Sequence, residues 1–442
     1  MDSDFQQKSK GIRDSDLESL IRMLYEERLK ICMLYSSIFP PDYEFDKDTM
    51  IQLWVAEGIF GLEQISASIE EVGGDTFDLM VATKLIVPSR FDMGYGQIQY
   101  KFNKNRFRDY YYAGRASVDD RLIVKESELG NISKEIKYLS LICKNFDDQT
   151  SEALKDFTGL RTLVLLCEPS SSITHVPRNV FLNLKHLVTL DLHQFNISEL
   201  PSSIGNLVSL HYLDVSETPI KHLPESIGSL RRLETIKLKG CLELHHLNTT
   251  KLIFLRHLDL DIVGQLNQMP TGMGSLRSLR TLKAFLIGTE DGCRVQELLY
   301  LNELSGSFCI SGLENISNSV EAQEAKLQDK QYLRKVELRW GGCHSDGPKV
   351  EDEILESLQP NSSIEELEIL FFNGFRLPSW ISDSSLHDIV SITLYKCKNC
   401  SRLPSLGTLP SLKYLELHQM TGITAIDHVF CRNYKVKGVM HF

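Results

Sequence analysis

Leucines in the middle of the chain recur in a fixed pattern, Leu-x-x-Leu-x-Leu. Aligned on its first leucine, the pattern begins at Leu187, Leu210, Leu233, Leu255 and Leu279, in steps of 23, 23, 22 and 24 residues. The x-Leu-x-Leu-x part alternates apolar and polar positions with period two, which predicts a short strand with its leucines on one face. One such strand is not stable alone, so the repetition predicts strands stacked around a shared leucine core.

The same pattern occurs upstream from Ile136 and downstream from Leu333 to Leu417. Its period is typical of leucine-rich repeats, which have roughly 20 to 29 residues per unit. We therefore predict an α/β solenoid, a leucine-rich-repeat horseshoe with a parallel sheet on its concave face. The register divides it into a first repeat segment, an insertion with a helix and a second repeat segment, at residues 136–287, 288–332 and 333–442. The last segment ends without a polar closing unit, so we expect an uncapped C-terminus.

The first 116 residues follow a different pattern. Helical periodicity covers residues 17–24, 50–57 and 69–85, and the alternating Ile98, Tyr100 and Phe102 then follow two glycines. Helices followed by a hairpin predict a small, mostly helical winged-helix domain at residues 1–116. Residues 117–135 are expected to be a linker.

Composition limits the class of protein. The chain has 442 residues, a formal net charge of −11 and ten scattered cysteines. It shows neither a secretory signal nor an apolar run long enough to span a membrane, so we expect a monomer with reduced thiols in the cytoplasm or nucleus. Since binding to phosphate backbones depends on Lys and Arg, the negative charge favours a protein partner over nucleic acid.

Two other functions are alternatives to protein recognition. Winged-helix domains also bind DNA, and the basic run KFNKNRFRDYYYAGR at residues 101–115 is the best support for that alternative. The run is short and contains Asp109, so an amphipathic helix packed inside the domain is the favoured interpretation. Common catalytic motifs are missing, so we expect no enzyme activity. The CxxC pair Cys397 and Cys400 is interpreted as core packing, since no further ligand pair accompanies it, and no metal site is predicted.

The polar positions that alternate with the strand leucines provide the candidate binding site. In a solenoid these positions form the concave surface, and mixed charges with aromatic rings suit a protein partner. Trp340 and Tyr212 are the strongest candidates, because large rings exposed to water are costly without a use. The full candidate set is His193, His211, Tyr212, Asp214, Glu217, Lys237, Lys239, Arg256, His257, Asp259, Asp261, Arg334, Glu337, Arg339, Trp340, Glu365, Glu366, Tyr395, Lys396, Tyr414 and Glu416.

The stretch LKICMLYSSIFPPDYEFDKDTMIQLWVAEGIF at residues 29–60 resembles a known family. It is similar to the winged-helix part of plant nucleotide-binding (NB-ARC) leucine-rich-repeat immune receptors of the coiled-coil type, in its Cys-x-x-x-x-x-Ile-Phe-Pro run and its Leu-Trp-x-Ala-Glu-Gly. The resemblance continues through the repeats and covers nearly the whole chain. It implies an intracellular receptor whose repeats recognise a pathogen effector or a guarded host protein. The NB-ARC module of a complete receptor is a further partner that the resemblance implies.

Departures from the family pattern limit what the resemblance implies. The chain has no Gly-Lys pair and therefore no Walker A loop, so we expect no cofactor and no functional ADP or ATP site. Asn103 stands where the family has a His that contacts the nucleotide. These departures indicate a truncated receptor with the winged helix as the remnant of a nucleotide switch. The alternative from another class is a leucine-rich-repeat adaptor that recruits substrates to a ubiquitin ligase.

Overall fold

The computed structural model divides the chain into two compact units. The first comprises Met1–Ser172, Asn179–Leu192 and Ser209–Leu213, and the second comprises Ile173–Arg178, His193–Val208 and Asp214–Phe442. The structure describes residues 27–61, 68–92, 97–106, 121–168, 171, 173–244, 251–260, 269–341 and 348–426. The helix predicted at 17–24, most of the basic run at 101–115 and the C-terminal end lie outside the described residues.

The winged-helix domain belongs to the first unit and follows the predicted order of helices and hairpin. Its elements are helical residues 27–36, α3 (Lys47–Ala56), α4 (Ile69–Ala82), β1 (Ile86–Asp92) and β2 (Gln97–Phe102). The carboxylate of Asp46 caps α3 by accepting a hydrogen bond from Thr49 N at 2.8 Å. Gly58 ends the same helix with φ of +71°, a conformation that glycine adopts without strain. Strands β1 and β2 pair antiparallel, which confirms the hairpin.

The first unit also contains the start of the repeat sheet. Its strands β3 (Arg121–Lys125), β4 (Tyr138–Cys143), β5 (Thr162–Cys167) and β6 (Thr189–Asp191) lie in chain order and pair in parallel. Strand β7 (Tyr212–Asp214) includes residues of both units. The predicted linker at 117–135 is therefore wrong over β3 and the 3-10 helix that follows it (Glu126–Asn131), because Val124 is buried in the sheet as a repeat leucine would be.

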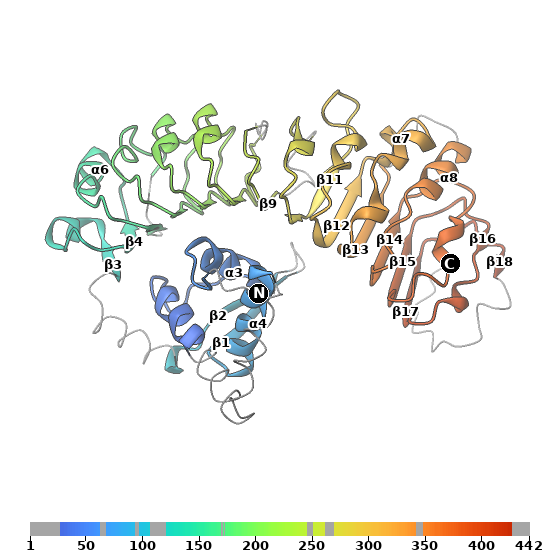
Figure 1. The fold of residues 1–442 in the computed structure, drawn as a ribbon, viewed down its shortest axis with the longest axis horizontal. Coiled ribbons are helices and arrows are strands. Elements are labelled where there is room, and N and C mark those ends of the chain that lie inside the picture. The colour runs from blue at the N-terminus through green and yellow to red at the C-terminus, as the bar shows by residue number, and fades with distance from the viewer. Residues whose placement is uncertain are drawn as a thin grey trace, which may run out of the picture. The chain divides into compact units, whose positions relative to one another are not determined.

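The second unit continues the parallel repeats (Figure 1). Strands β8 (Thr235–Lys237), β9 (His257–Asp259) and β10 (Thr281–Leu282) again follow chain order. A six-stranded parallel sheet contains β11 (Ala284–Leu286), β12 (Ser305–Ser311), β13 (Tyr332–Arg339), β14 (Glu366–Leu370), β15 (Ser391–Tyr395) and β17 (Tyr414–His418). The short strands β16 (Arg402–Leu403) and β18 (Ala425–Ile426) form a separate pair.

Return legs between the strands are short helices. Figure 1 shows α7 (Ser319–Gln323) and α8 (Pro348–Ser357) on the side of their repeats away from the strands. The others in the described residues are α6 (Asp148–Leu154) and the 3-10 helices Ser202–Asn206, Glu225–Ser229, Met273–Ser275, Val295–Leu298, Leu313–Asn315, Leu327–Asp329, Ser379–Ser382 and Leu406–Thr408. The predicted insertion at 288–332 is an elaborated repeat, because β12 pairs with strands on both of its sides.

The inward side chains form a continuous core, because successive strands pair in register. Leu367 lies opposite Ile392 and Ile392 opposite Leu415 on successive parallel strands, and the first two are fully buried. A fully buried side chain of this size contributes about 1.5–3 kcal/mol. Because the inward positions make this core, the alternate positions of each strand remain available for contacts with other groups.

Candidate partner-binding surface

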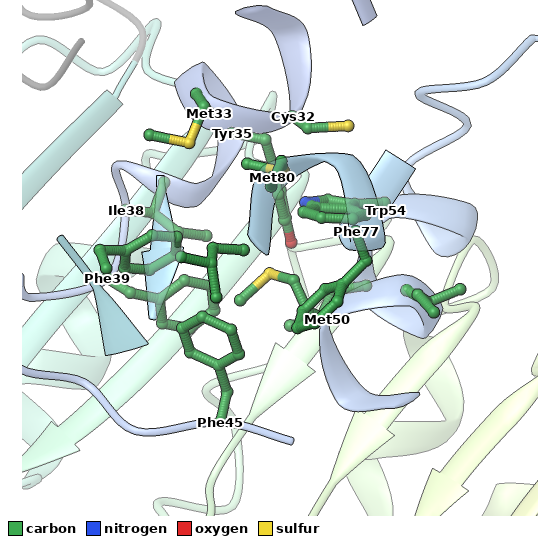
Figure 2. Close-up of a cluster of buried hydrophobic side chains, with 14 of the residues drawn as sticks. Cys32, Met33, Tyr35, Ile38, Phe39, Phe45, Met50, Trp54, Phe77 and Met80 are labelled. Atoms are coloured by element: carbon green, nitrogen blue, oxygen red, sulfur yellow. The ribbon is translucent and has the colours of Figure 1, made fainter. Parts of the chain in front are cut away.

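The strand face of the first repeats packs against the chain's own winged-helix domain. Val164 of β5 and Tyr212 of β7 belong to the same buried apolar cluster as Trp54 and Phe77 of α3 and α4. Figure 2 shows Trp54 and Phe77 converging in this cluster. Tyr212 has 0% of its surface exposed, so its predicted exposure is wrong. Its strand position does point away from the leucine core, but the winged-helix domain covers that position.

A buried carboxylate fixes the same packing. Glu57 follows α3, and its side chain is 1% exposed. It accepts hydrogen bonds from Thr162 Oγ1 at 2.5 Å and from Thr189 Oγ1 at 2.8 Å. Arg161 donates to it at 3.3 Å. The two threonines are register partners on β5 and β6, so one carboxylate bridges two adjacent repeats. Glu57 is the glutamate of the Leu-Trp-x-Ala-Glu-Gly motif, but no local sequence pattern pairs it with threonines more than a hundred residues away.

The buried hydroxyl of Tyr35 lies near this polar contact. Burial first, and the charge of Glu57 second, raise the pKa of Tyr35 well above its usual value. Its ring packs edge-on against Tyr138 of β4, with ring centroids 5.9 Å apart. Polar and aromatic contacts thus join the winged helix to the first repeats within one compact unit.

Outward side chains of the middle repeats bind one another. Lys237 and Asp259 are register partners, with Nζ and Oδ2 3.5 Å apart, and Lys283 approaches the same carboxylate at 3.2 Å. Nδ1 of His257 lies 2.9 Å from Thr281 Oγ1. Because opposite charges and hydrogen-bonding groups face each other across adjacent strands, these side chains satisfy one another. The predicted solvent exposure is wrong for Asp214, Lys237, Lys239 and His257, which are buried.

The other candidates in these repeats are partly accessible. His193, His211, Arg256 and Asp259 are half-buried, and Glu217 is exposed. Glu217 accepts a hydrogen bond from Gln194 Nε2 at 2.9 Å. Asp261 lies outside the described residues.

Trp340 was predicted to be exposed, and that prediction is wrong for a different reason. Val336 and Leu338 point into the core. Because side chains alternate along a strand, Trp340, two residues further on, points inward as well. Trp340 is 1% exposed and packs edge-on against Phe372, with centroids 5.0 Å apart. It is a core residue.

The six-stranded sheet presents the accessible surface that the sequence predicts. Outward side chains of β13, β14, β15 and β17 are half-buried or exposed and lie in register, and we call this surface the open strand face. Its residues are Lys335, Glu337, Arg339, Glu366, Glu368, Leu370, Ser391, Thr393, Tyr395, Tyr414, Glu416 and His418. The structure brings together six of the predicted residues, Glu337, Arg339, Glu366, Tyr395, Tyr414 and Glu416. Arg334, Glu365 and Lys396 flank them. Strict alternation along each strand would have added the members that the prediction missed.

Ion pairs cross the open strand face. Lys335 Nζ lies 2.5 Å from Glu368 Oε1 and 3.6 Å from Glu366 Oε2. Burial alone would lower the pKa of Lys335, but the hydrogen bond to Glu368 and the nearby carboxylates outweigh burial and raise it. Arg339 Nη2 lies 2.6 Å from Glu337 on its own strand. The face therefore binds cationic groups of its own chain.

Asn103 forms hydrogen bonds with neighbouring backbone groups of the winged-helix domain. Its backbone N donates to Leu85 O at 2.9 Å, and its side-chain oxygen accepts from Asn105 N at 3.2 Å. These bonds join the end of the hairpin to the turn after α4. The prediction that the chain lacks a nucleotide site stays a prediction.

Two structural features of the described residues bear on function. Among them, no three His, Cys, Asp or Glu side chains are grouped so that they could hold a metal ion. In the same residues, no helix is long and apolar enough to cross a membrane.

Comparisons with known families match both parts of the chain. Residues 38–103 match the winged-helix domain of disease resistance proteins. Residues 158–220 match a leucine-rich repeat family, and residues 295–420 match the leucine-rich repeats of R13L1/DRL21. The last of these matches includes the strands of the open strand face.

Individual relatives agree with these matches. Disease resistance protein RGA2 of Solanum bulbocastanum is 32% identical over 92% of this chain and 39% of its own length. A disease resistance RPP13-like protein 1 of Arabidopsis thaliana is 32% identical over 94% of this chain and 40% of its own length. The chain thus spans about 40% of these relatives. Among solved structures, the functional domain of InlJ from Listeria monocytogenes has 17% identity and a TM-score of 0.43, and the match covers 68% of this chain and 57% of InlJ.

Proposed function

Because the chain belongs to the plant disease resistance proteins that join a winged-helix domain to leucine-rich repeats, we propose that it acts in defence by recognising a protein through the open strand face. The recognised protein is a pathogen effector or a host protein that effectors modify. We place this recognition in the cytoplasm or nucleus, and it requires no catalysis by the chain.

One observation carries the choice of surface. Equivalent outward positions are buried at Tyr212, Lys237 and His257, whereas they are accessible at Tyr395 and Tyr414. Tyr414 is 58% exposed, and large accessible rings are frequent anchors of protein interfaces. A partner can therefore contact the rings of the open strand face directly.

We also propose that the winged-helix domain is the remnant of a nucleotide switch. What supports this role is the match of residues 38–103 together with the Glu57 contact to the first repeats. The NB-ARC module of a complete receptor is the second partner we propose.

An interaction screen tests the proposed surface. The full chain is screened against secreted pathogen proteins and leaf proteins, in parallel with a Tyr395→Ala/Tyr414→Ala variant and a Tyr300→Ala control. Tyr300 is 51% exposed and follows the return helix Val295–Leu298. We expect partners that bind the wild type and the control and are lost from the double variant. Equal binding to all three chains overturns the proposed surface, and recovery of ubiquitin-ligase subunits favours the adaptor alternative.

A further inference from the structure

Three rows of side chains cross the open strand face. The first runs Lys335, Glu366, Ser391, Tyr414 and the second runs Glu337, Glu368, Thr393, Glu416 in register across four strands. The third runs Arg339, Leu370, Tyr395, His418. Four glutamates are thus set against one lysine and one arginine, which leaves this surface acidic on a chain whose net charge is −11.

Small side chains on β15 form a shallow column between taller neighbours. Ser391 lies between Glu366 and Tyr414, and Thr393 lies between Glu368 and Glu416. Neighbouring strands are about 4.8 Å apart, so a side chain above Thr393 lies within reach of both flanking carboxylates. Glu416 is 57% exposed on its side chain, and its near partner His418 is 3.2 Å away.

The chain's own cations show which chemistry this surface accepts. Lys335 is held by Glu368 and Glu366, as described above. At the far end of the strands, Lys396 Nζ lies 5.2 Å from the centre of the Phe371 ring and 5.1 Å from that of Tyr395. Carboxylates and aromatic faces therefore each bind an ammonium group here, and both are the usual partners of lysine and arginine.

A carboxylate and an aromatic ring are also accessible on β17, next to β15. Glu416 and Tyr414 lie two residues apart on β17 and point to the same face as Thr393. Both are exposed, and Tyr414 is directly opposite the small Ser391. A cation arriving from outside would meet carboxylates at two sides and an aromatic ring at a third.

We propose that the open strand face binds an extended, basic segment of a protein partner, with a lysine or arginine side chain above Thr393 between Glu368 and Glu416. The inference rests on the proposed function and specifies the chemistry of its partner. Alternating residues of an extended segment match the spacing of the rows, so a second basic side chain reaches Glu366. Ion pairs at the rim of such a contact speed association and make it depend on salt.

Synthetic peptides test the inference on the full chain. The probe is a labelled peptide of about ten residues that alternates arginine with threonine, a length typical of one long strand. A matched peptide with glutamate in place of arginine is the acidic control. Fluorescence anisotropy at low and at physiological ionic strength measures binding to three chains: wild type, Glu368→Gln/Glu416→Gln, and Glu225→Gln/Glu243→Gln. The last pair removes the same charge from exposed return-leg positions of the second unit.

We expect the basic peptide to bind the wild type and the return-leg control alike. Binding to Glu368→Gln/Glu416→Gln should be roughly tenfold weaker, a loss of about 1.4 kcal/mol for two solvent-accessible ion pairs. The acidic peptide should not bind. Equal binding to both double variants, or equal binding of both peptides, overturns the inference.

The interaction screen separates this inference from the proposed function. Partners that are lost from Tyr395→Ala/Tyr414→Ala but retained by Glu368→Gln/Glu416→Gln overturn the basic segment and leave the recognition surface standing. Partners retained by both variants overturn the surface itself. Melting curves of each variant confirm that the repeats remain folded.

Discussion

The carboxylate of Glu57 accepts a hydrogen bond from Thr189 Oγ1 at 2.8 Å, although the two residues are 132 positions apart in the chain. One belongs to the winged-helix domain and the other to a repeat strand. A buried carboxylate is costly unless donors surround it, and here Thr162, Thr189 and Arg161 provide them. The contact therefore depends on one specific orientation of the winged helix on the first repeats.

Replacing Glu57 with alanine should weaken this unit. The change leaves the threonine hydroxyls and Arg161 without their acceptor, so we expect the free energy of unfolding to fall by about 2 kcal/mol. Urea unfolding followed by tryptophan fluorescence measures the loss, because Trp54 lies in the adjacent core.

Glu44→Ala is the matched control for this change. Glu44 bonds Arg90 at 2.8 Å, but this pair lies at the surface of the same unit, so its loss should cost less than about 1 kcal/mol. Equal losses for Glu44→Ala and Glu57→Ala would contradict a special role for the buried carboxylate.

The rings of Tyr212 and Trp340 should matter for stability. Both are fully buried, and truncating a buried aromatic ring costs about 3–5 kcal/mol. Tyr212→Ala and Trp340→Ala should therefore each lower the melting temperature by several degrees, measured by differential scanning fluorimetry. Tyr414→Ala removes a ring that is 58% exposed and should change stability by no more than about 0.5 kcal/mol. A melting temperature unchanged by Tyr212→Ala would indicate that this ring is not part of the core.

Local patterns predicted the elements of the fold because their causes are local. Leucine alternation fixes the inward face of each strand, and the glycine-flanked run before Ile98 marks the hairpin. The extent of the sheet is harder to predict, since β3 lacks the full leucine pattern and its sequence predicts a linker.

Contacts between distant segments could not be predicted in this way. Alternation places Tyr212 outward, but it does not reveal that the winged helix covers that position. The mutual pairing of Lys237 and Asp259 depends on the register of two repeats, which a single repeat does not encode. Trp340 is different, because the alternation through Val336 and Leu338 already places its side chain on the buried face of the strand.

The CxxC pair offers a test of core packing against metal binding. Cys397 and Cys400 are buried, and their thiols donate to Ile369 O at 3.7 Å and Gly374 O at 3.6 Å. Burial raises the pKa of Cys400 to about 12 and that of Cys397 further, so we expect both thiols to stay protonated and to react slowly with alkylating agents.

Iodoacetamide labelling at mildly alkaline pH, followed by peptide mass spectrometry, should therefore modify the exposed Cys167 before either member of the pair. Cys397 and Cys400 should react only when urea unfolds the repeats. Rapid labelling of the native pair, or a rise in melting temperature on adding zinc, would favour a metal or redox role.

Lys330 should make the native state more stable as the pH rises through the alkaline range. Its ammonium is buried and donates to Leu298 O at 2.7 Å and to Leu301 O at 3.3 Å. Burial lowers its pKa from the ordinary 10.5 to about 8, with the charge of Asp329 opposing the shift. Between these values the unfolded chain holds a proton that the native chain has released, so the native state gains stability as pH rises from about 8 toward 10.

Comparison with Lys330→Met isolates this contribution, because all other titrating groups are shared. The free energy of unfolding of the wild type minus that of the variant should increase across this range by roughly 1–3 kcal/mol. Urea unfolding at a series of pH values measures the difference. A difference that stays constant or falls as pH rises would mean that the pKa of Lys330 is not lowered in the folded chain, and hence that its ammonium is better solvated than its buried position implies.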